Sequence, residues 1–429
     1  MTVEERHYPD VDETVVREKL PNGLEVHVLP KAGCSKTYAV FATRYGSVDN
    51  RFAVNGEEIR VPDGIAHFLE HKMFEEPDGD IFAKFAKQGA SANAFTSFDR
   101  TVYLFTAAGQ IPENLETLLD FVQRPYFTDE NVEKEKGIIE QEINMYRDNP
   151  DWQVYFGLIG ALYQRHPVRI DIAGTAESIR RIDKETLYRC YETFYHPSNM
   201  TLVVAGGADP EDVIRLVREN QAKKSFAPAP EISRLFDAEP PEVGSPRVER
   251  ELPVSLPKCM IGFKETDLVR DADGLMRREA ATKLMFEALI GPSSELYQSL
   301  YDDQLISDSF GSEYNCTPEY AFSVIGGETR DPDALLARIR EAIERAKAEG
   351  LDPARFERAK RKRIGALLRM LDRPESAANE YLRWNLRGGN LFRLPELYRD
   401  IGIGEAEERL RAHFDWNRMA VSIVRSRKA

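Results

Sequence analysis

The stretch His67-Phe68-Leu69-Glu70-His71 holds the residues of this chain that are best suited to chemistry. On a helix, residues four apart project from the same face, so the imidazoles of His67 and His71 would stand side by side. Two neutral imidazoles make a clamp for a divalent metal ion. Glu70 lies beside that clamp, where it could take a proton from a metal-bound water. The spacing therefore predicts two metal ligands and the general base of a zinc peptidase. The motif has the order His-x-x-Glu-His rather than the commoner His-Glu-x-x-His.

The alternative is that these two histidines are ordinary residues of an amphipathic helix. The chain has only seven histidines, so a chance pair at this spacing around a glutamate would be unusual. The flanking sequence also favours a helix with one buried face, which would consist of Phe68, Leu69, Met73 and Phe74. The polar side of that helix would carry the metal site.

A catalytic zinc ion usually takes three protein ligands, so another ligand is needed. A second helix is predicted over residues 132–146 from its apolar positions 132, 138, 139, 143 and 146. Glu135 and Glu142 lie seven residues apart in it and share a face across two turns. However, four glutamates lie between positions 133 and 142, and a solvated helix face would look the same. Spacing alone leaves the choice among them open.

Taken together, these motifs resemble those of the insulinase/pitrilysin metallopeptidases, the family that includes mitochondrial processing peptidase. In that family the His-x-x-Glu-His helix is followed by a helix with Glu-x6-Glu, whose second Glu is a zinc ligand. Here the pattern falls on Glu135 and Glu142. The resemblance implies one Zn²⁺ per chain, bound by His67, His71 and Glu142, with Glu70 as the general base. It implies for Glu135 an outer-shell role in the catalytic site, orienting a ligand.

Between the two helices, residues 89–106 have the Thr, Phe, Tyr and Val content of a strand, a turn and a second strand. The resemblance implies that Asn93 and Ala94 mark an edge strand, to which a peptide substrate adds as a further β-strand. Such pairing recognises an extended backbone rather than one side chain. The alternative for Asn93 is a residue that only caps a turn.

Length and an internal duplication predict two domains. A chain of 429 residues is too long for one hydrophobic core. The end of the first half, Pro197 to Val204, resembles the end of the second, Trp416 to Val424, and a Pro-rich stretch lies between the halves. We therefore predict an α+β fold in which each domain is an antiparallel-rich sheet with helices on one face. The predicted limits are 1–225 for a zinc-binding domain, 226–250 for a linker and 251–429 for a homologous domain without metal.

The second half lacks the chemistry of the first. Its counterpart of the metal helix, residues 281–289, has no histidine. Active single-chain relatives carry in their second domain a Leu-Arg-x6-Tyr segment, whose Arg and Tyr hold the substrate carbonyl and stabilise the oxyanion. Here Tyr301 stands in place of the Arg and Asp308 in place of the Tyr. The resemblance implies that a paralogous subunit supplies both groups in a heterodimer, with a homodimer as the alternative. Each chain would be half of a clamshell around the peptide.

The composition of the chain indicates which partners and which cellular compartment to expect. The net charge of −14 and a pI of about 5.2 argue against nucleic acid as a partner, because a polyanion would be repelled on average. No apolar run approaches the length of a membrane span and the N-terminus is acidic and polar, so we expect no membrane contact and no signal peptide. The four cysteines are far apart and form no Cys-x-x-Cys pair, which indicates reduced thiols in a cytoplasmic protein.

The predicted function is that of a zinc-dependent endopeptidase that hydrolyses small or unfolded peptides. Two other functions remain open. One is a catalytically silent structural subunit, against which the intact His67, Glu70, His71 and Glu142 argue. The other is a non-proteolytic peptide-binding or modification-associated subunit of the same family, which the altered second half favours.

Overall fold

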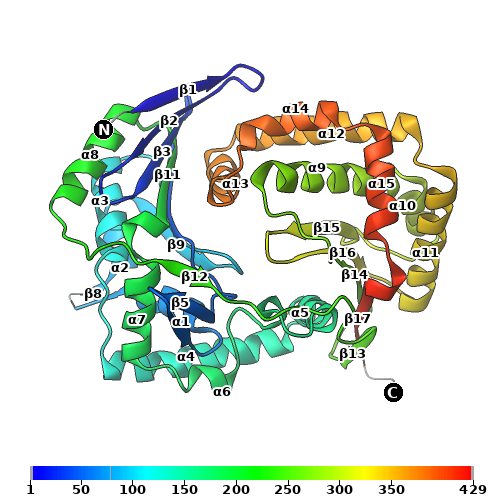
Figure 1. Ribbon diagram of the computed structural model, residues 1–429, viewed down its shortest axis with the longest axis horizontal. Coiled ribbons are helices and arrows are strands. Elements are labelled where there is room, and N and C mark those ends of the chain that lie inside the picture. Colours follow the sequence, from blue (N-terminus) through cyan, green and yellow to red (C-terminus); the bar gives the residue numbers. More distant parts are fainter. Residues whose placement is uncertain (1–2, 78, 427–429) are drawn as a thin grey trace.

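The computed structural model describes residues 3–77 and 79–426, which fold into two lobes (Figure 1). The first lobe holds the N-terminal half of the chain and the second lobe the C-terminal half. Two helices, α4 (Asp129–Asp148) and α5 (Pro150–Leu162), follow one side of the molecule from the first lobe to the second. Among the described residues, no helix is both long and apolar enough to cross a membrane.

The main sheet of the first lobe has the strand order β1-β2-β3-β11-β4-β10-β9. Neighbouring strands are antiparallel, apart from the parallel pair β3 and β11. The strands are β1 (Glu4–Tyr8), β2 (Glu13–Lys19), β3 (Glu25–Pro30), β4 (Thr37–Thr43), β9 (Ala90–Thr96), β10 (Thr101–Ala107) and β11 (Met200–Gly206). Smaller sheets join β5 (Arg51–Val54) with β6 (Glu57–Arg60) and β12 (Ile232–Arg234), and β7 (Glu75–Glu76) with β8 (Gly79–Asp80). In this arrangement β9 forms one edge of the main sheet.

The central strands β4 and β11 are buried along their whole length, because both faces of the sheet are covered. Side chains of a strand alternate between the two faces. In β4, Ala39 and Phe41 belong to the core under the helices of the first lobe, whereas Val40 and Ala42 belong to a core shared with the second lobe. This two-sided burial explains the continuous apolar run in the sequence.

The second lobe repeats the plan of the first. Its sheet has the order β13-β17-β14-β16-β15, and only β13 and β17 are parallel among its described strands. This order matches β3-β11-β4-β10-β9 strand for strand, with the parallel pair in the same place. The strands are β13 (Arg247–Glu251), β14 (Lys258–Lys264), β15 (Gly311–Cys316), β16 (Ala321–Glu328) and β17 (Met419–Arg425). The predicted duplication and the predicted α+β fold are therefore confirmed.

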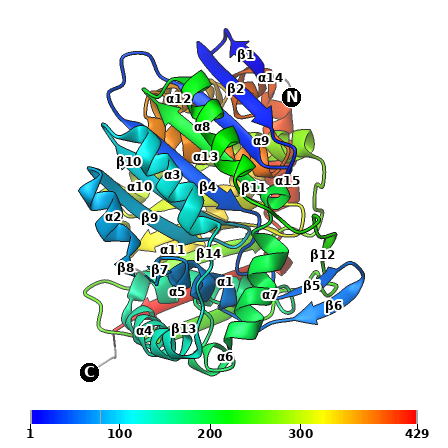
Figure 2. The same cartoon turned by 90° about the vertical axis from the view of Figure 1, so that its left-hand side faces the viewer.

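Helices cover the outer face of each sheet. Figure 2 shows α3 and α8 on the first sheet, where they pack on β10 and β3. Besides α4 and α5, the helices of the first half are α1 (Ile65–Lys72), α2 (Ile81–Lys87), α3 (Ile111–Val122), α6 (Ala176–Ile179), α7 (Lys184–Phe194) and α8 (Pro210–Ala222). Those of the second lobe are α9 (Ala272–Leu289), α10 (Glu295–Asp302), α11 (Pro332–Glu349), α12 (Pro353–Leu371), α13 (Pro374–Leu386), α14 (Leu394–Asp400) and α15 (Ile403–His413). Short 3-10 helices are η1 (Pro167–Arg169), η2 (Pro197–Asn199), η3 (Leu391–Arg393) and η4 (Trp416–Arg418).

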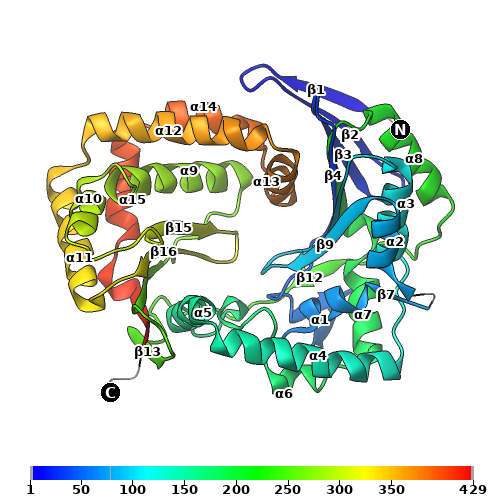
Figure 3. The ribbon, with the colours of Figure 1, turned by 180° about the vertical axis from the view of Figure 1, so that it is seen from behind.

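Each half of the chain also gives one helix to the other lobe. α5 packs on β14 and β17, and its Leu158 and Leu162 share a core with Phe322 and Ala420 of the second lobe. In the opposite direction, α13 packs on β4 and β11 of the first lobe (Figure 3). The sheet face that is free of its own lobe's helices is thus covered by a helix from the other half.

The stretch predicted as a linker, 226–250, is not a free tether. Within it, β12 pairs with β5 of the first lobe, and β13 lies beside β17 in the second sheet. Arg234 in this stretch also binds Asp49 at 2.7 Å. The chain therefore crosses between the lobes with both ends of the crossing hydrogen-bonded. The domain limits at 1–225 and 251–429 stay predictions.

Candidate metal centre

The motif helix α1 begins after Gly64, whose backbone is in the left-handed region at φ 87°. A Cβ at this position would lie 2.4 Å from the carbonyl oxygen of Ala173, so the close approach of these two loops requires glycine. Phe68 and Leu69 are fully buried and fix the helix against the core. The two neighbouring polar residues of the motif, His67 and Glu70, are each only 8% exposed, so water has little access to them.

The second helix, α4, brings the acidic side chains to α1. It begins with a capping box in which the side chains of Thr128 and Asn131 each accept a hydrogen bond from the other's backbone N–H. Its buried apolar residues are Val132, Ile139 and Ile143. The apolar pattern was wrong for Ile138, which is 45% exposed. It lies about 100° around the helix from its neighbour Ile139 and so points away from the core.

The structure brings together the three side chains that were predicted to bind the metal. Nε2 of His67 lies 3.7 Å, and Nε2 of His71 3.5 Å, from Oε2 of Glu142. One ligand atom from each residue lies within 4.8 Å of the other two. The two imidazole rings are neighbours, with centroids 4.6 Å apart. Two imidazoles and a carboxylate around one point are a donor set that suits zinc, so these residues fit the ion.

Burial prepares His67 to act as a ligand. It lowers the pKa of His67 to about 3, and the neighbouring His71 acts in the same direction. The imidazole is therefore neutral near pH 7 and can offer the lone pair of Nε2 to a cation. Glu142 is oriented by Tyr146, whose hydroxyl donates to Oε1 at 2.5 Å. This bond leaves Oε2 of Glu142 facing the two histidines.

Glu135 contacts His71 on the side of the ring that faces away from Glu142. Its Oε1 accepts a hydrogen bond from Nδ1 of His71 at 3.0 Å, so that Nε2 faces Glu142. Its Oε2 lies 3.7 Å from Nζ of Lys72, whose side chain is fully buried. Burial by itself would raise the pKa of Glu135, but His71 and Lys72 outweigh that effect and the pKa is lowered. An ionised carboxylate behind a histidine is the arrangement that orients a metal ligand.

Replacing Glu135 with Gln is expected to weaken zinc binding by about 10- to 100-fold, because the charge that fixes the tautomer of His71 is lost. The dissociation constant would be measured by competition with a chromogenic chelator. Glu133→Gln is the matched control on the same helix, since Glu133 is 69% exposed and bonds only to Lys136 among the described residues. If the dissociation constant for zinc is unchanged in Glu135→Gln, Glu135 does not orient a metal ligand.

Glu70 lies beside the three ligands with the properties of a proton acceptor. Burial raises the pKa of Glu70 to about 7, against the lowering effect of His71 and of Thr96. The hydroxyl of Thr96 donates to Oε2 of Glu70 at 3.1 Å. A base whose pKa lies near the working pH can both accept and return a proton, which is what general acid–base catalysis needs.

Asn93 and Ala94 lie in the middle of β9, so the reading of Asn93 as a turn cap is wrong. Asn93 is exposed, and its Oδ1 accepts a hydrogen bond from the backbone N–H of Ala94 at 2.9 Å. β9 pairs with β10 on one side and forms the edge of the sheet on the other. Its last residue is Thr96, which contacts Glu70. An open strand edge therefore leads directly to the base.

Sequence reasoning missed three residues that support the centre: Lys72, Thr96 and Tyr146. Tyr146 follows Glu142 by four residues on α4, so helical spacing could have paired them. Thr96 lies on the same strand as Asn93, but only the packing of α1 against β9 brings it to Glu70. Lys72 directly follows the motif. A lysine is usually exposed, so nothing in the sequence indicates that this one is buried.

In the second lobe, the equivalent helices form an ion-paired interface instead of a metal site. Glu287 of α9 binds Lys362 of α12 at 2.5 Å and Arg363 at 3.4 Å. The two positions that depart from the Leu-Arg-x6-Tyr segment, Tyr301 and Asp308, are exposed and line one hollow of about 590 Å³. Tyr301 lies on α10, at the opposite side of the molecule from α1 (Figure 1).

Comparison with known proteins agrees with these features. The family model described as insulinase (peptidase family M16) matches residues 57–176, which include α1 and α4. The model described as peptidase M16 inactive domain matches residues 181–363. The two matches cover the metal-site region and much of the second lobe, respectively.

Similar proteins extend over nearly the whole chain. The zinc protease YmfH of Bacillus subtilis is 48% identical over 97% of this chain and 98% of its own length. The beta subunit of mitochondrial-processing peptidase from Caenorhabditis elegans is 25% identical, covering 91% of this chain and 84% of that protein. A crystal structure of an M16-like peptidase from Alicyclobacillus acidocaldarius has a TM-score of 0.94 and 42% identity, with 99% of both chains covered. On its sequence and fold, the chain belongs to the insulinase family of peptidases, M16.

Proposed function

We propose that this chain is a zinc-dependent endopeptidase that hydrolyses small or unfolded peptides. The observation that carries the proposal is the convergence of His67, His71 and Glu142 beside a buried Glu70, at the end of an open strand edge. Each of these features serves peptide hydrolysis. Zinc, when bound, would polarise the peptide carbonyl and make water a better nucleophile.

In this proposal the protein side chains have distinct roles. Glu70 accepts a proton from the attacking water and then returns it to the departing amine nitrogen. Thr96 holds the carboxylate of Glu70 by its hydrogen bond to Oε2. His67, His71 and Glu142 would hold the metal, with Glu135 and Tyr146 orienting two of these ligands.

The substrate would bind as a strand along β9. An extended peptide can pair with the backbone at this edge near Asn93 and Ala94, which places its chain in line with Glu70. Pairing of this kind needs a segment without secondary structure of its own. We therefore assign small or unfolded peptides, rather than folded proteins, as substrates.

We further propose that the active form contains two chains that close like a clamshell, the second supplying an Arg and a Tyr. The departure at Tyr301 and Asp308 supports this, since an acidic side chain cannot stabilise a developing oxyanion. The partner would be a paralogous subunit or a second copy of this chain.

The four cysteines of this chain are all free, which supports a reducing compartment such as the cytoplasm.

Metal removal provides the test of the peptidase proposal. The purified chain, with and without its paralogue, would be incubated with a library of unstructured peptides, and zinc would be measured in the same samples. We expect cleavage to be lost on treatment with 1,10-phenanthroline and to return when one equivalent of zinc is added. Cleavage that persists in metal-free protein would contradict the proposal.

A second candidate, a non-proteolytic peptide-binding subunit, is favoured by the altered positions Tyr301 and Asp308. It predicts that peptides bind with measurable affinity but are never cleaved, with or without zinc or paralogue. The same library experiment, read by binding as well as by product formation, distinguishes the two functions.

A further inference from the structure

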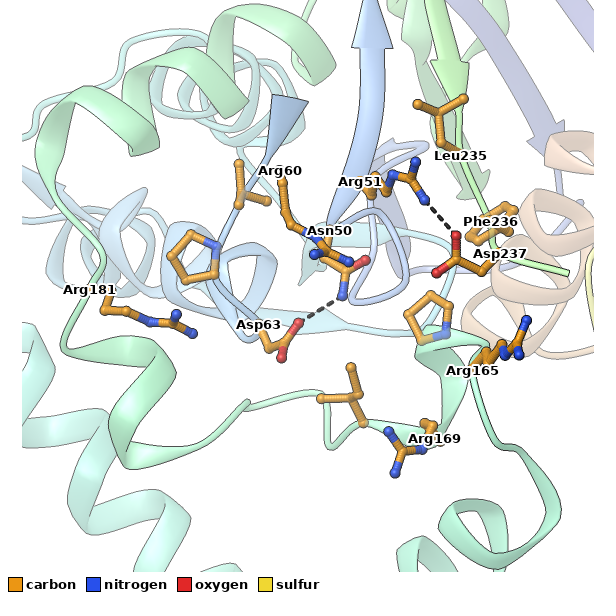
Figure 4. A pocket seen from close by; sticks show the side chains of 14 residues that line it. Asn50, Arg51, Arg60, Asp63, Arg165, Arg169, Arg181, Leu235, Phe236 and Asp237 are labelled. Carbon is orange, nitrogen blue, oxygen red and sulfur yellow. Dashed lines mark hydrogen bonds and ion pairs between the residues drawn. The ribbon is translucent and has the colours of Figure 1, made fainter. Parts of the chain in front are cut away.

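The first lobe also has a hollow of about 540 Å³ that is lined by none of the candidate metal ligands. Five arginines line it, and we call it the arginine pocket: Arg51, Arg60, Arg165, Arg169 and Arg181. They come from β5, β6, the segment around η1 and the loop between α6 and α7. Figure 4 shows the side chains of Arg60, Arg169 and Arg181 on different sides of the hollow. Folding has therefore gathered positive charge from segments that are far apart in the sequence.

The carboxylates that line the pocket are already engaged. Asp63 accepts a hydrogen bond from Asn50 at 2.7 Å, and Asp237 binds Arg51 at 2.6 Å. Arg51 also binds Glu58 at 2.7 Å. In the part of the chain that the structure describes, the other four arginines of the pocket have no carboxylate within 4.0 Å of their side-chain nitrogens. Their positive charge is therefore available to a ligand.

The pocket gathers these cations although the chain carries a net charge of −14. The sequence offers 72 acidic residues that could have paired with these arginines. Like charges around a concave surface create a positive potential that attracts an anion. The planar guanidinium group binds the oxygens of phosphate or carboxylate through two parallel hydrogen bonds.

Apolar side chains also line the pocket and would suit an organic ligand. Ile170, Leu235 and Phe236 are among them. Phe236 is held in place by stacking on His166, with ring centroids 4.8 Å apart. The volume lies in the range of roughly 300–1,000 Å³ that small organic ligands occupy, and is larger than a lone inorganic anion needs. We propose that the arginine pocket binds an organic phosphate, its phosphate on the arginines and its apolar body against the apolar side chains of the lining.

The position of the pocket links its ligand to both lobes. Leu235 and Phe236 belong to the crossing between lobes, and Arg165 follows α5, which packs on the second sheet. Asp63 precedes Gly64 and so the metal helix α1. A ligand here contacts all three segments at once. It would therefore stabilise the native arrangement of the lobes in proportion to its binding.

Phenyl phosphate is a suitable probe, because it combines one phosphate with one apolar ring. We expect it to bind the zinc-loaded full chain in isothermal titration calorimetry, more tightly than inorganic phosphate and much more tightly than phenol. At about 100 times its dissociation constant it should raise the Tm by roughly 3 °C. Succinate serves as the carboxylate probe and should bind more weakly than phenyl phosphate.

Variants at the pocket would locate the binding. Arg169→Gln and Arg181→Gln should each weaken phenyl phosphate binding by at least about tenfold, the usual consequence of losing a charge-assisted contact. Arg180→Gln is the matched control, because Arg180 is adjacent in sequence but binds Glu140 outside the pocket. Zinc content and Tm without ligand would show that each variant is folded. The site would be overturned if all three variants bound phenyl phosphate equally well, or if the natural chain did not bind it. Tighter binding of succinate than of phenyl phosphate would overturn the assignment of the ligand as a phosphate.

Discussion

Replacing Glu70 with Gln is expected to lower kcat for peptide hydrolysis by about 10²- to 10⁴-fold, the usual contribution of a general base. Glutamine has the same shape and can still accept the hydrogen bond that Thr96 donates to Glu70. It cannot accept a proton from water near neutral pH. The proposed metal ligands His67, His71 and Glu142 are untouched, so zinc should remain at one ion per chain.

The measurement combines initial rates on an unstructured peptide with metal analysis of the same sample. Glu140→Gln is the control, because Glu140 lies on α4 close to Glu142 but binds Arg180 on the protein surface. That variant should keep its full rate. Loss of zinc in Glu70→Gln would show that Glu70 acts on the metal itself, and retention of more than a tenth of the rate would rule it out as the base.

The metal centre could be predicted from sequence because helical geometry converts spacing into position. Residues four apart share a face, so His67 and His71 had to be neighbours once α1 formed. The choice between the glutamates of α4 came from family resemblance, since spacing alone did not separate Glu142 from a solvated face. The structure brings the oxygen of Glu142 to both histidines.

The exchange of helices between lobes could not be predicted in the same way. Hydrophobic periodicity shows that a helix has a buried side but not which sheet covers it. α5 follows α4 after a single residue, Asn149, yet it packs on the sheet of the other lobe. Predicted domain limits based on sequence order therefore divide a core that the two halves build together.

The arginine pocket could not be predicted from the sequence either, because its residues are brought together only by the fold. Its five arginines are spread between positions 51 and 181, and each alone reads as an ordinary exposed residue. The overall charge of −14 argues against nucleic acid as a partner but leaves a local basic groove open. Net charge describes the average field of a protein, whereas a concave site responds to the few charges that line it.

Purified alone, the chain is expected to bind zinc but to cleave peptides about 10²- to 10³-fold more slowly than in the presence of its paralogue. The loss of one oxyanion donor usually has this effect, and two such groups are replaced here, so the factor is a lower bound. The reason lies in Tyr301 of α10 and in Asp308 of the segment that follows α10, which occupy the positions of the Arg and the Tyr. α10 lies far from α1 of the same chain. Rates would be measured for each chain alone and for an equimolar mixture, with zinc quantified in all three samples.

Two variants test whether the missing groups are the cause. A paralogue whose Arg of the Leu-Arg-x6-Tyr segment is replaced by Ala should fail to raise the rate of the mixture. In this chain, the double variant Tyr301→Arg and Asp308→Tyr places both groups on an exposed hollow, where new side chains have room. A gain in rate without the paralogue would mean that a second copy of this chain provides the other half of the site. Full activity of the natural chain alone would refute the requirement for a partner, because no Arg or Tyr would then be missing from the reaction.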